Sequence, residues 1–148
     1  MQLTQYTDYS LRVLIYLSQK LEVELATIAE IAEFYDISRN HLVKVVHNLA
    51  IYGFIQTTRG KNGGLRLARP ADKIGLGDVV RKTESNMDIA ECFGKENRAC
   101  LISPVCSLKS ILSNASANFM QTLDGFTVAD ALNSQQGFPK KMNVISTK

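Results

Sequence analysis

Residues 38–69 contain two successive structural patterns in the sequence SRNHLVKVVHNLAIYGFIQTTRGKNGGLRLAR. Four apolar residues in the first half recur at the spacing of one helix face: Leu42, Val45, Val46 and Leu49. Ser38 precedes them as a candidate N-cap, and Gly53 follows them as a residue type that commonly ends a helix. This half therefore predicts a helix from Ser38 to about Tyr52.

The second half of this stretch has the pattern of a β-hairpin. Residues 54–58 and 65–68 are rich in apolar and β-branched side chains and predict two short strands. Residues 59–64, RGKNGG, lie between them and supply glycines that tolerate the positive φ angles of a tight turn. The stretch therefore predicts a helix followed by a basic hairpin.

Two further helices are predicted before this stretch. Residues 7–21 carry a broad apolar stripe, with Thr7 as a candidate cap. Thr27 and Glu30 have the spacing of a capping box, which predicts a short second helix that ends near residues 36–38. Two helices, a capped third helix and a hairpin in this order predict a winged helix-turn-helix, a mainly α fold with a small β-hairpin wing.

The C-terminal half predicts more helix. Residues 76–83 have a helical pattern, and Ser103-Pro104 is a strong helix start. Apolar residues then recur at alternating steps of three and four, which is the spacing of a seam between two packed helices: Val105, Leu108, Leu112, Ala115 and Phe119. Residues 127–132 predict one more turn. The long helix is therefore expected to pair with another helix.

The composition is typical of a soluble globular protein. The chain has 148 residues, of which 45% are hydrophobic and 21% charged, so it has room for one domain and an arm. No run approaches the roughly 20 consecutive apolar residues that span a bilayer. The N-terminus, MQLTQ, lacks the basic start and apolar core of a signal peptide. We therefore expect a cytoplasmic protein with no membrane partner.

Positive charge is concentrated in the predicted third helix and hairpin. Between Asp36 and Pro70, six basic residues stand against one acidic residue, a distribution expected of a surface that meets phosphates. The residues predicted to contact double-stranded DNA lie at the start of the helix and at the tip of the wing: Ser38, Arg39, Asn40, His41, Lys44, Arg59, Lys61 and Asn62. Arginine can bind guanine, and asparagine can bind adenine, with two hydrogen bonds each.

All three cysteines, Cys92, Cys100 and Cys106, lie within 15 positions. An odd number of cysteines in a cytosolic protein argues against a disulfide framework. Thiolates suit iron–sulfur clusters, and the wide intervals here lack the short Cys-x-x-Cys pairs of most structural zinc sites. Cys106 is expected as the third residue of the helix begun by Ser103-Pro104, where the helix dipole stabilises a thiolate. A zinc site and a thiol switch stay open as alternatives.

A four-iron cluster needs a fourth ligand, which three cysteines do not supply. The candidate carboxylates are Asp8, Asp88, Glu91 and Glu96, and spacing does not choose among them. Asp8 has another role available, because it lies in the first turn of a helix and can pair with Arg12. An enzyme is not expected, since neither histidine is placed to serve a cysteine nucleophile and no phosphate-cradling glycine motif is present.

Three segments together resemble one family of regulators. They are LTQYTDY at residues 3–9, SRNHLVK at residues 38–44 and RGKNGGLRL at residues 59–67. These motifs are similar to those of the NsrR type of nitric-oxide-sensing iron–sulfur winged-helix transcription regulator, a relative of IscR. The resemblance covers roughly residues 1–130, and the joined motifs are specific.

The resemblance implies a homodimeric repressor that binds a two-fold symmetric operator and leaves DNA when nitric oxide destroys its iron–sulfur cluster (4Fe-4S or 2Fe-2S). It implies that Cys92, Cys100 and Cys106 are joined as cluster ligands by the partner subunit's Asp8. IscR-like proteins have a histidine three residues after the last cysteine, where this chain has Lys109. The alternatives are a thiol- or zinc-based redox-responsive regulator and a regulator that senses iron–sulfur status.

These predictions divide the chain into three parts. Residues 1–70 are expected to form the winged helix-turn-helix DNA-binding domain. Residues 71–133 are expected to form the cluster-binding loop and the dimerisation helix, and residues 134–148 a flexible tail.

Overall fold

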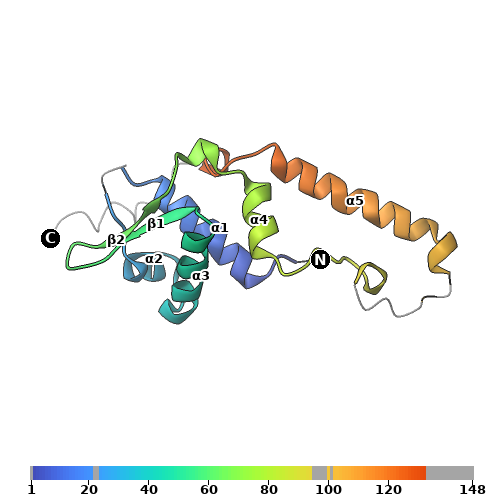
Figure 1. Ribbon diagram of the computed structural model, residues 1–148, viewed down its shortest axis with the longest axis horizontal. Helices are drawn as coiled ribbons and strands as arrows, with labels where there is room; N and C mark the ends of the chain where they lie inside the picture. Colours follow the sequence, from blue (N-terminus) through green and yellow to red (C-terminus); the bar gives the residue numbers. More distant parts are fainter. Residues whose placement is uncertain (1, 22–23, 95–99, 101, 133–148) are drawn as a thin grey trace.

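The computed structural model describes residues 2–21, 24–94, 100 and 102–132. The α-helices and strands are α1 (Gln5–Ser18), α2 (Ile28–Tyr35), α3 (Arg39–Ile51), β1 (Ile55–Thr58), β2 (Gly64–Leu67), α4 (Leu76–Thr83) and α5 (Ser107–Asp124). Four short 3-10 helices join them: η1 (Ala71–Lys73), η2 (Glu91–Phe93), η3 (Ser103–Val105) and η4 (Asp130–Leu132). Helices α1 to α4 and the hairpin cluster together, and α5 extends away from them (Figure 1). The predicted fold, a mainly helical winged helix-turn-helix with a small hairpin, is confirmed.

The first helix begins earlier than its sequence pattern predicts. Thr4 occupies the N-cap, and its Oγ1 accepts a hydrogen bond from the backbone N–H of Thr7 at 3.3 Å. Thr7 is therefore not the cap; it lies inside α1 and is fully buried. The predicted range 7–21 is also too long at its other end, since α1 stops at Ser18. Both threonines can cap a helix, and tertiary burial of Thr7 decides between them.

The caps of α2 and α3 differ. Thr27 and Glu30 form both bonds of the predicted capping box, with Thr27 Oγ1 accepting from the Glu30 N–H at 3.2 Å. Helix α2 then ends at Asp36, its C-cap, which has a left-handed φ of 54°. Ser38 takes the N-cap position of α3 as predicted, but its side chain makes no capping hydrogen bond. Helix α3 ends before Gly53, whose φ of 73° suits a glycine.

The hairpin is held against the helices by close backbone contact. Strands β1 and β2 pair antiparallel in the register Ile55↔Leu67. Ala26, from the loop before α2, adds a bridge to Leu65 through two backbone hydrogen bonds of 2.7 and 3.0 Å. A Cβ on Gly64 would lie 2.8 Å from the Ala26 carbonyl oxygen, so this approach needs glycine.

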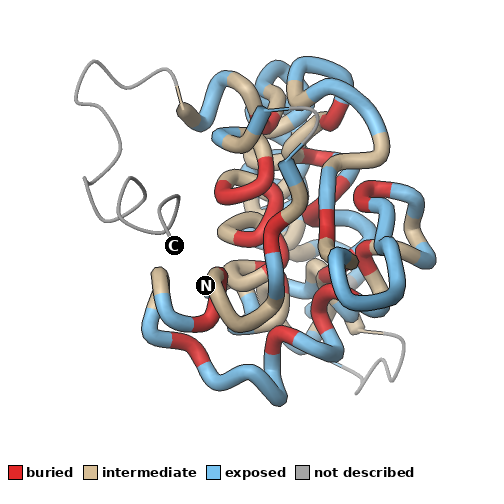
Figure 2. The backbone as a smooth tube through the Cα atoms, turned by 90° about the vertical axis from the view of Figure 1, so that its left-hand side faces the viewer, coloured by how far each residue is buried: buried red, intermediate tan, exposed pale blue. Residues whose placement is uncertain are grey.

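The core lies among α1, α2, α3, α4 and the hairpin. Its largest fully buried side chains are Tyr16, Leu14, Ile31, Leu42, Leu49, Ile74, Val13, Val45, Val79, Val80, Val128 and Thr7. Buried and exposed stretches alternate along the backbone (Figure 2), as amphipathic patterns predict. The four apolar residues that defined the third helix all belong to this core.

Helix α5 is exposed along its length. None of its described side chains is buried. Of the predicted seam, Val105 is 82% and Leu108 59% exposed, whereas Leu112 and Phe119 are partly buried. Its start also differs from the prediction, because Ser103-Pro104 opens only η3. Helix α5 begins at Ser107, so Cys106 occupies its N-cap position and is not the third residue of a helix. The chain turns out of α-geometry at Cys106, with ψ at 104°.

The last described turn, η4, agrees with the turn predicted over residues 127–132. The predicted tail, residues 134–148, lies outside the described residues. Across the described ranges, every helix is too short or too polar to span a bilayer.

Candidate nucleic-acid interface and cysteine segment

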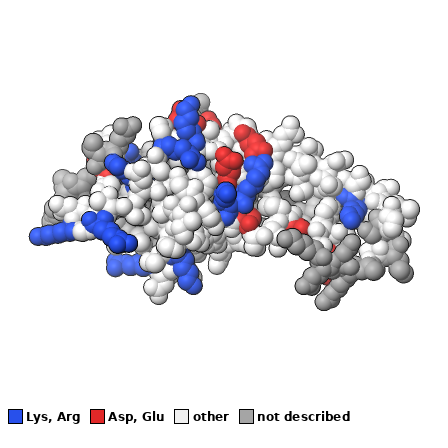
Figure 3. Space-filling model, viewed as in Figure 1, with Lys and Arg blue, Asp and Glu red and all other residues white. Residues whose placement is uncertain are grey.

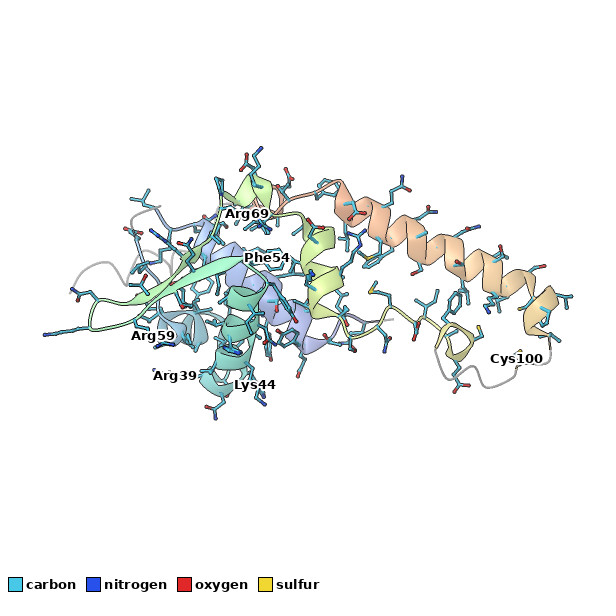
Figure 4. All side chains as sticks on the ribbon, in the orientation of Figure 1. Arg39, Lys44, Phe54, Arg59, Arg69 and Cys100 are labelled. Carbon is cyan, nitrogen blue, oxygen red and sulfur yellow. The ribbon has the colours of Figure 1, made fainter. Side chains whose placement is uncertain are left out.

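One side of α3 presents a mainly polar surface, which also includes Val43, 50% exposed. Packing of its apolar face into the core leaves the opposite face in solvent, including every residue predicted to read DNA there: Ser38, Arg39, Asn40, His41 and Lys44. Arg39 and Lys44 project from the lower edge of the molecule (Figure 4). The arrangement can offer hydrogen-bond donors and acceptors to the edges of base pairs.

The wing extends this polar surface. Arg59, Lys61 and Asn62 are exposed in the turn between β1 and β2. Basic side chains project from the wing and from the lower edge over α3, whereas acidic side chains gather nearer the middle of the molecule (Figure 3). Two separate elements therefore carry positive charge, as phosphate contact from a helix and a wing requires.

The remaining basic residues of the hairpin are held by local contacts. Arg66 donates to Gln56 Oε1 across the strands at 2.9 Å. Arg69 lies over the Phe54 ring, 5.4 Å from its centroid, and donates to the Lys73 carbonyl oxygen at 3.0 Å. These side chains brace the base of the hairpin, so part of the basic surplus in this region is structural.

Sequence reasoning missed the contact between the first turn of α1 and the DNA-facing side of α3. The Tyr9 and His41 rings lie 6.2 Å apart. They line a cleft of about 340 Å³ together with Tyr6 and Lys44. The only sequence signal was the aromatic pair Tyr6 and Tyr9 beside Asp8, which does not reveal the partner helix. The cleft joins α1 directly to the predicted DNA-reading residues.

Asp8 lies in this same first turn of α1. Its carboxylate pairs with Arg12 at 2.9 Å, and both side chains are 43% exposed. The ion pair expected from their spacing is therefore present within one chain. The pKa of Tyr35 is raised to about 12, chiefly because burial disfavours the phenolate, and the negative charge of Asp8 adds a smaller rise.

The N-terminus of α1 is tied to the end of α4. The Glu84 carboxylate accepts from the Thr4 backbone N–H at 2.7 Å and from its hydroxyl at 3.1 Å. Glu84 is the C-cap residue of α4, directly before the segment that leads to Cys92. The start of α1 is thus bonded to the end of α4, eight residues before Cys92.

The three cysteines all lie at the end of the molecule away from the wing. Cys92 is half-buried on η2, Cys106 is half-buried at the start of α5, and Cys100 is exposed in the loop between them. Figure 4 shows Cys100 at the opposite end of the molecule from Arg39 and Arg59. All three thiols are free.

The donor set suits an iron–sulfur cluster in its chemistry, because three free thiols share one short segment. Within a single chain, the described residues contain no group of three or more His, Cys, Asp or Glu side chains that could hold a metal ion. Residues 95–99, between Cys92 and Cys100, include the predicted candidate Glu96 and lie outside the described residues. Asp8 lies on α1 and is not grouped with the cysteines among the described residues of one chain.

Comparison with known proteins identifies the family. Residues 3–134 match the family model Rrf2, described as iron-dependent transcriptional regulator. The HTH-type transcriptional regulator NsrR of Bacillus subtilis is 44% identical over 144 residues, covering 97% of this chain and 99% of that protein. NsrR of Shouchella clausii is 46% identical over 130 residues, covering 88% of this chain and 87% of that protein. These relatives are transcriptional regulators, in agreement with the prediction that the chain is not an enzyme.

Solved structures support the fold independently. The T. potens IscR structure has a TM-score of 0.72 at 21% identity and covers 96% of both chains. Oxidised Staphylococcus aureus CymR has a TM-score of 0.73 at 24% identity, over 92% of this chain and 99% of that one. The identities are too low to carry more than the fold, whereas the family match and the NsrR relatives carry the class of function. The chain belongs to the Rrf2 family and is a DNA-binding transcription regulator.

Proposed function

We propose that this chain is a homodimeric repressor that releases operator DNA when nitric oxide destroys an iron–sulfur cluster bound to it. The observation that carries the proposal is the separation of two chemistries in one chain. An exposed basic surface on α3 and the wing lies at one end, and three free thiols lie at the other. Similarity to regulators named NsrR supports the assignment.

The proposed DNA-binding part is the winged helix of residues 1–70. Residues 38–44 on α3 would enter the major groove, where Arg39 and Asn40 can each read one base with two hydrogen bonds. Arg59 and Lys61 on the wing would contact the flanking phosphates or the adjacent minor groove. Residues 71–133 would carry the sensor and the dimer contact.

The proposed cluster ligands are Cys92, Cys100 and Cys106, with the partner subunit's Asp8 completing the set. When bound, such a cluster supplies iron centres with which nitric oxide reacts. The chain's own part is to hold three thiolates at one end of α5. Cys106 would contribute from the N-cap position of α5.

The chain offers a physical route from the cysteine segment to the DNA-facing helix. Asp8 lies on α1, one residue before Tyr9, whose ring contacts His41 on α3. Glu84 separately ties the start of α1 to the end of α4, through hydrogen bonds to Thr4. A shift of α1 would therefore be transmitted to α3, and a small rotation of α3 misaligns half-sites that lie about 34–36 Å apart.

Paired variants separate a ligand role of Asp8 from its ion pair with Arg12. Both Asp8→Ala and Arg12→Ala break the 2.9 Å ion pair, but only the first removes the carboxylate. We expect anaerobically purified Asp8→Ala protein to retain less iron and sulfide than Arg12→Ala protein. Equal iron and sulfide in the two variants and the unsubstituted protein would rule out Asp8 as a ligand.

DNA binding is tested separately, with the duplex that the protein selects from a random pool. Affinity for this duplex should fall steeply with salt, because several phosphate contacts release counterions. A protein that selects no sequence and binds no duplex would contradict the regulator assignment. Zinc in place of iron would contradict the cluster and leave DNA binding intact.

A further inference from the structure

Helices α4 and α5 meet at a two-bond ion pair between Arg81 and Asp124. The two terminal nitrogens of Arg81 donate to the two carboxylate oxygens of Asp124, at 2.6 and 2.5 Å. The pair raises the pKa of Arg81 and lowers that of Asp124, in both cases chiefly through these hydrogen bonds. A second carboxylate, Asp78, lies farther from Arg81, at 3.8 Å.

Gly77 leaves the space that this pair needs. A Cβ at Gly77 would lie 1.9 Å from Asp124 Oδ1 and 3.0 Å from the terminal Nη1 of Arg81. Both atoms are side-chain ends, so a side chain at position 77 would have to displace the Arg81–Asp124 pair from this position. The absence of a side chain at Gly77 therefore leaves room for the pair.

The remaining contacts hold the same end of α5. The Leu76 N–H donates to the Phe126 carbonyl oxygen at 2.9 Å, just beyond the end of the helix. The Val128 N–H donates to the Ile74 carbonyl oxygen at 2.9 Å, and the Val128 side chain is fully buried in the core. The other end of α5, which carries Cys106, extends away from the winged helix (Figure 1).

The Arg81–Asp124 pair constrains the orientation of α5 more than it stabilises the fold. Its side chains are 46% and 44% exposed, and ion pairs at such exposure stabilise folding little. A guanidinium bound to a carboxylate through two parallel hydrogen bonds is, however, strongly constrained in geometry. It resists rotation of α5 about its attached end.

We infer that Arg81 and Asp124, seated over Gly77, are positioning residues that set the angle between α4 and the α5 arm. Because α4 packs on α1, and α1 on α3, this is also the angle between the winged helix and the arm. In a dimer paired through α5, this angle sets the spacing of half-sites that the two winged helices accept. The inference rests on the proposed function, because it requires a dimer of that kind.

The length of α5 amplifies a small change at this joint. Its 18 residues extend about 27 Å, so a rotation of about 5° at one end moves the other by about 2 Å. That displacement is more than half of the roughly 3.4 Å rise between base pairs. Loss of the Arg81–Asp124 pair should therefore weaken discrimination between operators whose half-site spacings differ by one base pair.

The test uses the full chain and the palindromic duplex that the unsubstituted protein selects from a random pool. Affinity is compared with duplexes in which the half-sites are one base pair closer or farther apart. Arg81→Met and Asp124→Asn should each reduce the preference for the selected spacing by about threefold or more. The exchange of both charges, Arg81→Asp with Asp124→Arg, should restore part of it.

Asp78→Asn is the matched control, because it removes the same charge beside the same arginine but not the two-bond contact. It should keep the preference. Arg81→Lys retains the charge but not the paired geometry, so it should lose preference, which distinguishes positioning from simple attraction. Dimer mass and thermal unfolding are measured for every variant.

If Arg81→Met and Asp124→Asn remain folded dimers with the original spacing preference, the inference is overturned while the proposed function stands. If the unsubstituted protein selects no palindrome, both are overturned. A retained preference in Arg81→Lys would also overturn the positioning role, because charge alone would then suffice.

Discussion

Helices α3 and α5 have similar sequence patterns but different surroundings. Both repeat apolar residues at steps of three and four, yet α3 buries four side chains and α5, although longer, buries none of its described side chains. Periodicity identifies a face that needs a partner, but it does not say whether the partner is the same chain. The apolar face of α3 meets α1 and α2, whereas Leu108 and Ile111 on α5 are 59% and 62% exposed.

The largest expected effect separates these two faces. Leu42→Ala on α3 empties a fully buried site and should cost about 2–5 kcal/mol of unfolding free energy. The matched change Leu108→Ala on α5 removes a 59% exposed side chain and should mainly weaken dimerisation. Denaturant unfolding at several protein concentrations, together with sedimentation equilibrium, measures both. Equal losses at high dilution would contradict the contrast.

A second comparison sets an exposed basic residue on α3 against an exposed basic residue on α4. Arg39→Ala should cost about 1–3 kcal/mol of binding free energy for the selected duplex and relax specificity at one base position. Lys82→Ala on α4 removes the same charge from an exposed site outside the proposed interface. Fluorescence anisotropy with single-base variants of the duplex is the measurement. A similar loss in both variants would indicate general charge attraction.

The caps of α2 and α3 sharpen the comparison within the winged helix. Thr27→Ala removes a capping bond of 3.2 Å and should cost about 1 kcal/mol of unfolding free energy. Ser38→Ala removes a side chain that makes no capping hydrogen bond, so it should cost less in stability and more in DNA affinity. Thermal unfolding and duplex binding of both variants give the two quantities. The reverse order of stabilities would contradict the cap assignment.

The last expected effect appears only at alkaline pH and concerns Tyr35, which packs against the core. Because burial raises the folded-state pKa of Tyr35 to about 12 from an ordinary 10.0, its contribution to stability is complete below pH 10. That contribution is lost as pH rises from 10 towards 12. Tyr35→Phe should flatten this part of the stability profile, as measured by denaturant unfolding. If the unfolding free energy of Tyr35→Phe falls between pH 10 and 12 as steeply as that of the unsubstituted protein, Tyr35 is not the cause of the fall.

Local patterns predicted most of the winged helix. The capping box of Thr27 and Glu30, the glycine after α3 and the two strands each depend on residues close together in sequence, and all are confirmed. The predicted cap Thr7 was wrong because its neighbour Thr4 has the same chemistry, and long-range burial selects between them. The predicted start of the long helix at Ser103-Pro104, with Cys106 as its third residue, was wrong because these residues begin only a short 3-10 turn.

The site was predictable in part. Exposure of the DNA-facing residues follows directly from which face of α3 is apolar, so sequence alone could place them. Contacts between distant segments could not be predicted in this way: Tyr9 with His41, Thr4 with Glu84, and Arg81 with Asp124. Each joins elements whose relative placement depends on the assembled core. The ligand roles of the cysteines and of Asp8 stay predictions.

The most direct test of the proposed function is an anaerobic titration of the full protein with nitric oxide. Visible absorbance and affinity for the selected duplex are followed in the same samples. We expect a coloured, iron- and sulfide-containing protein whose absorbance and DNA affinity fall together, with the same stoichiometry. A protein that loses its colour while its affinity stays constant, or that contains no iron when purified anaerobically, would contradict the account.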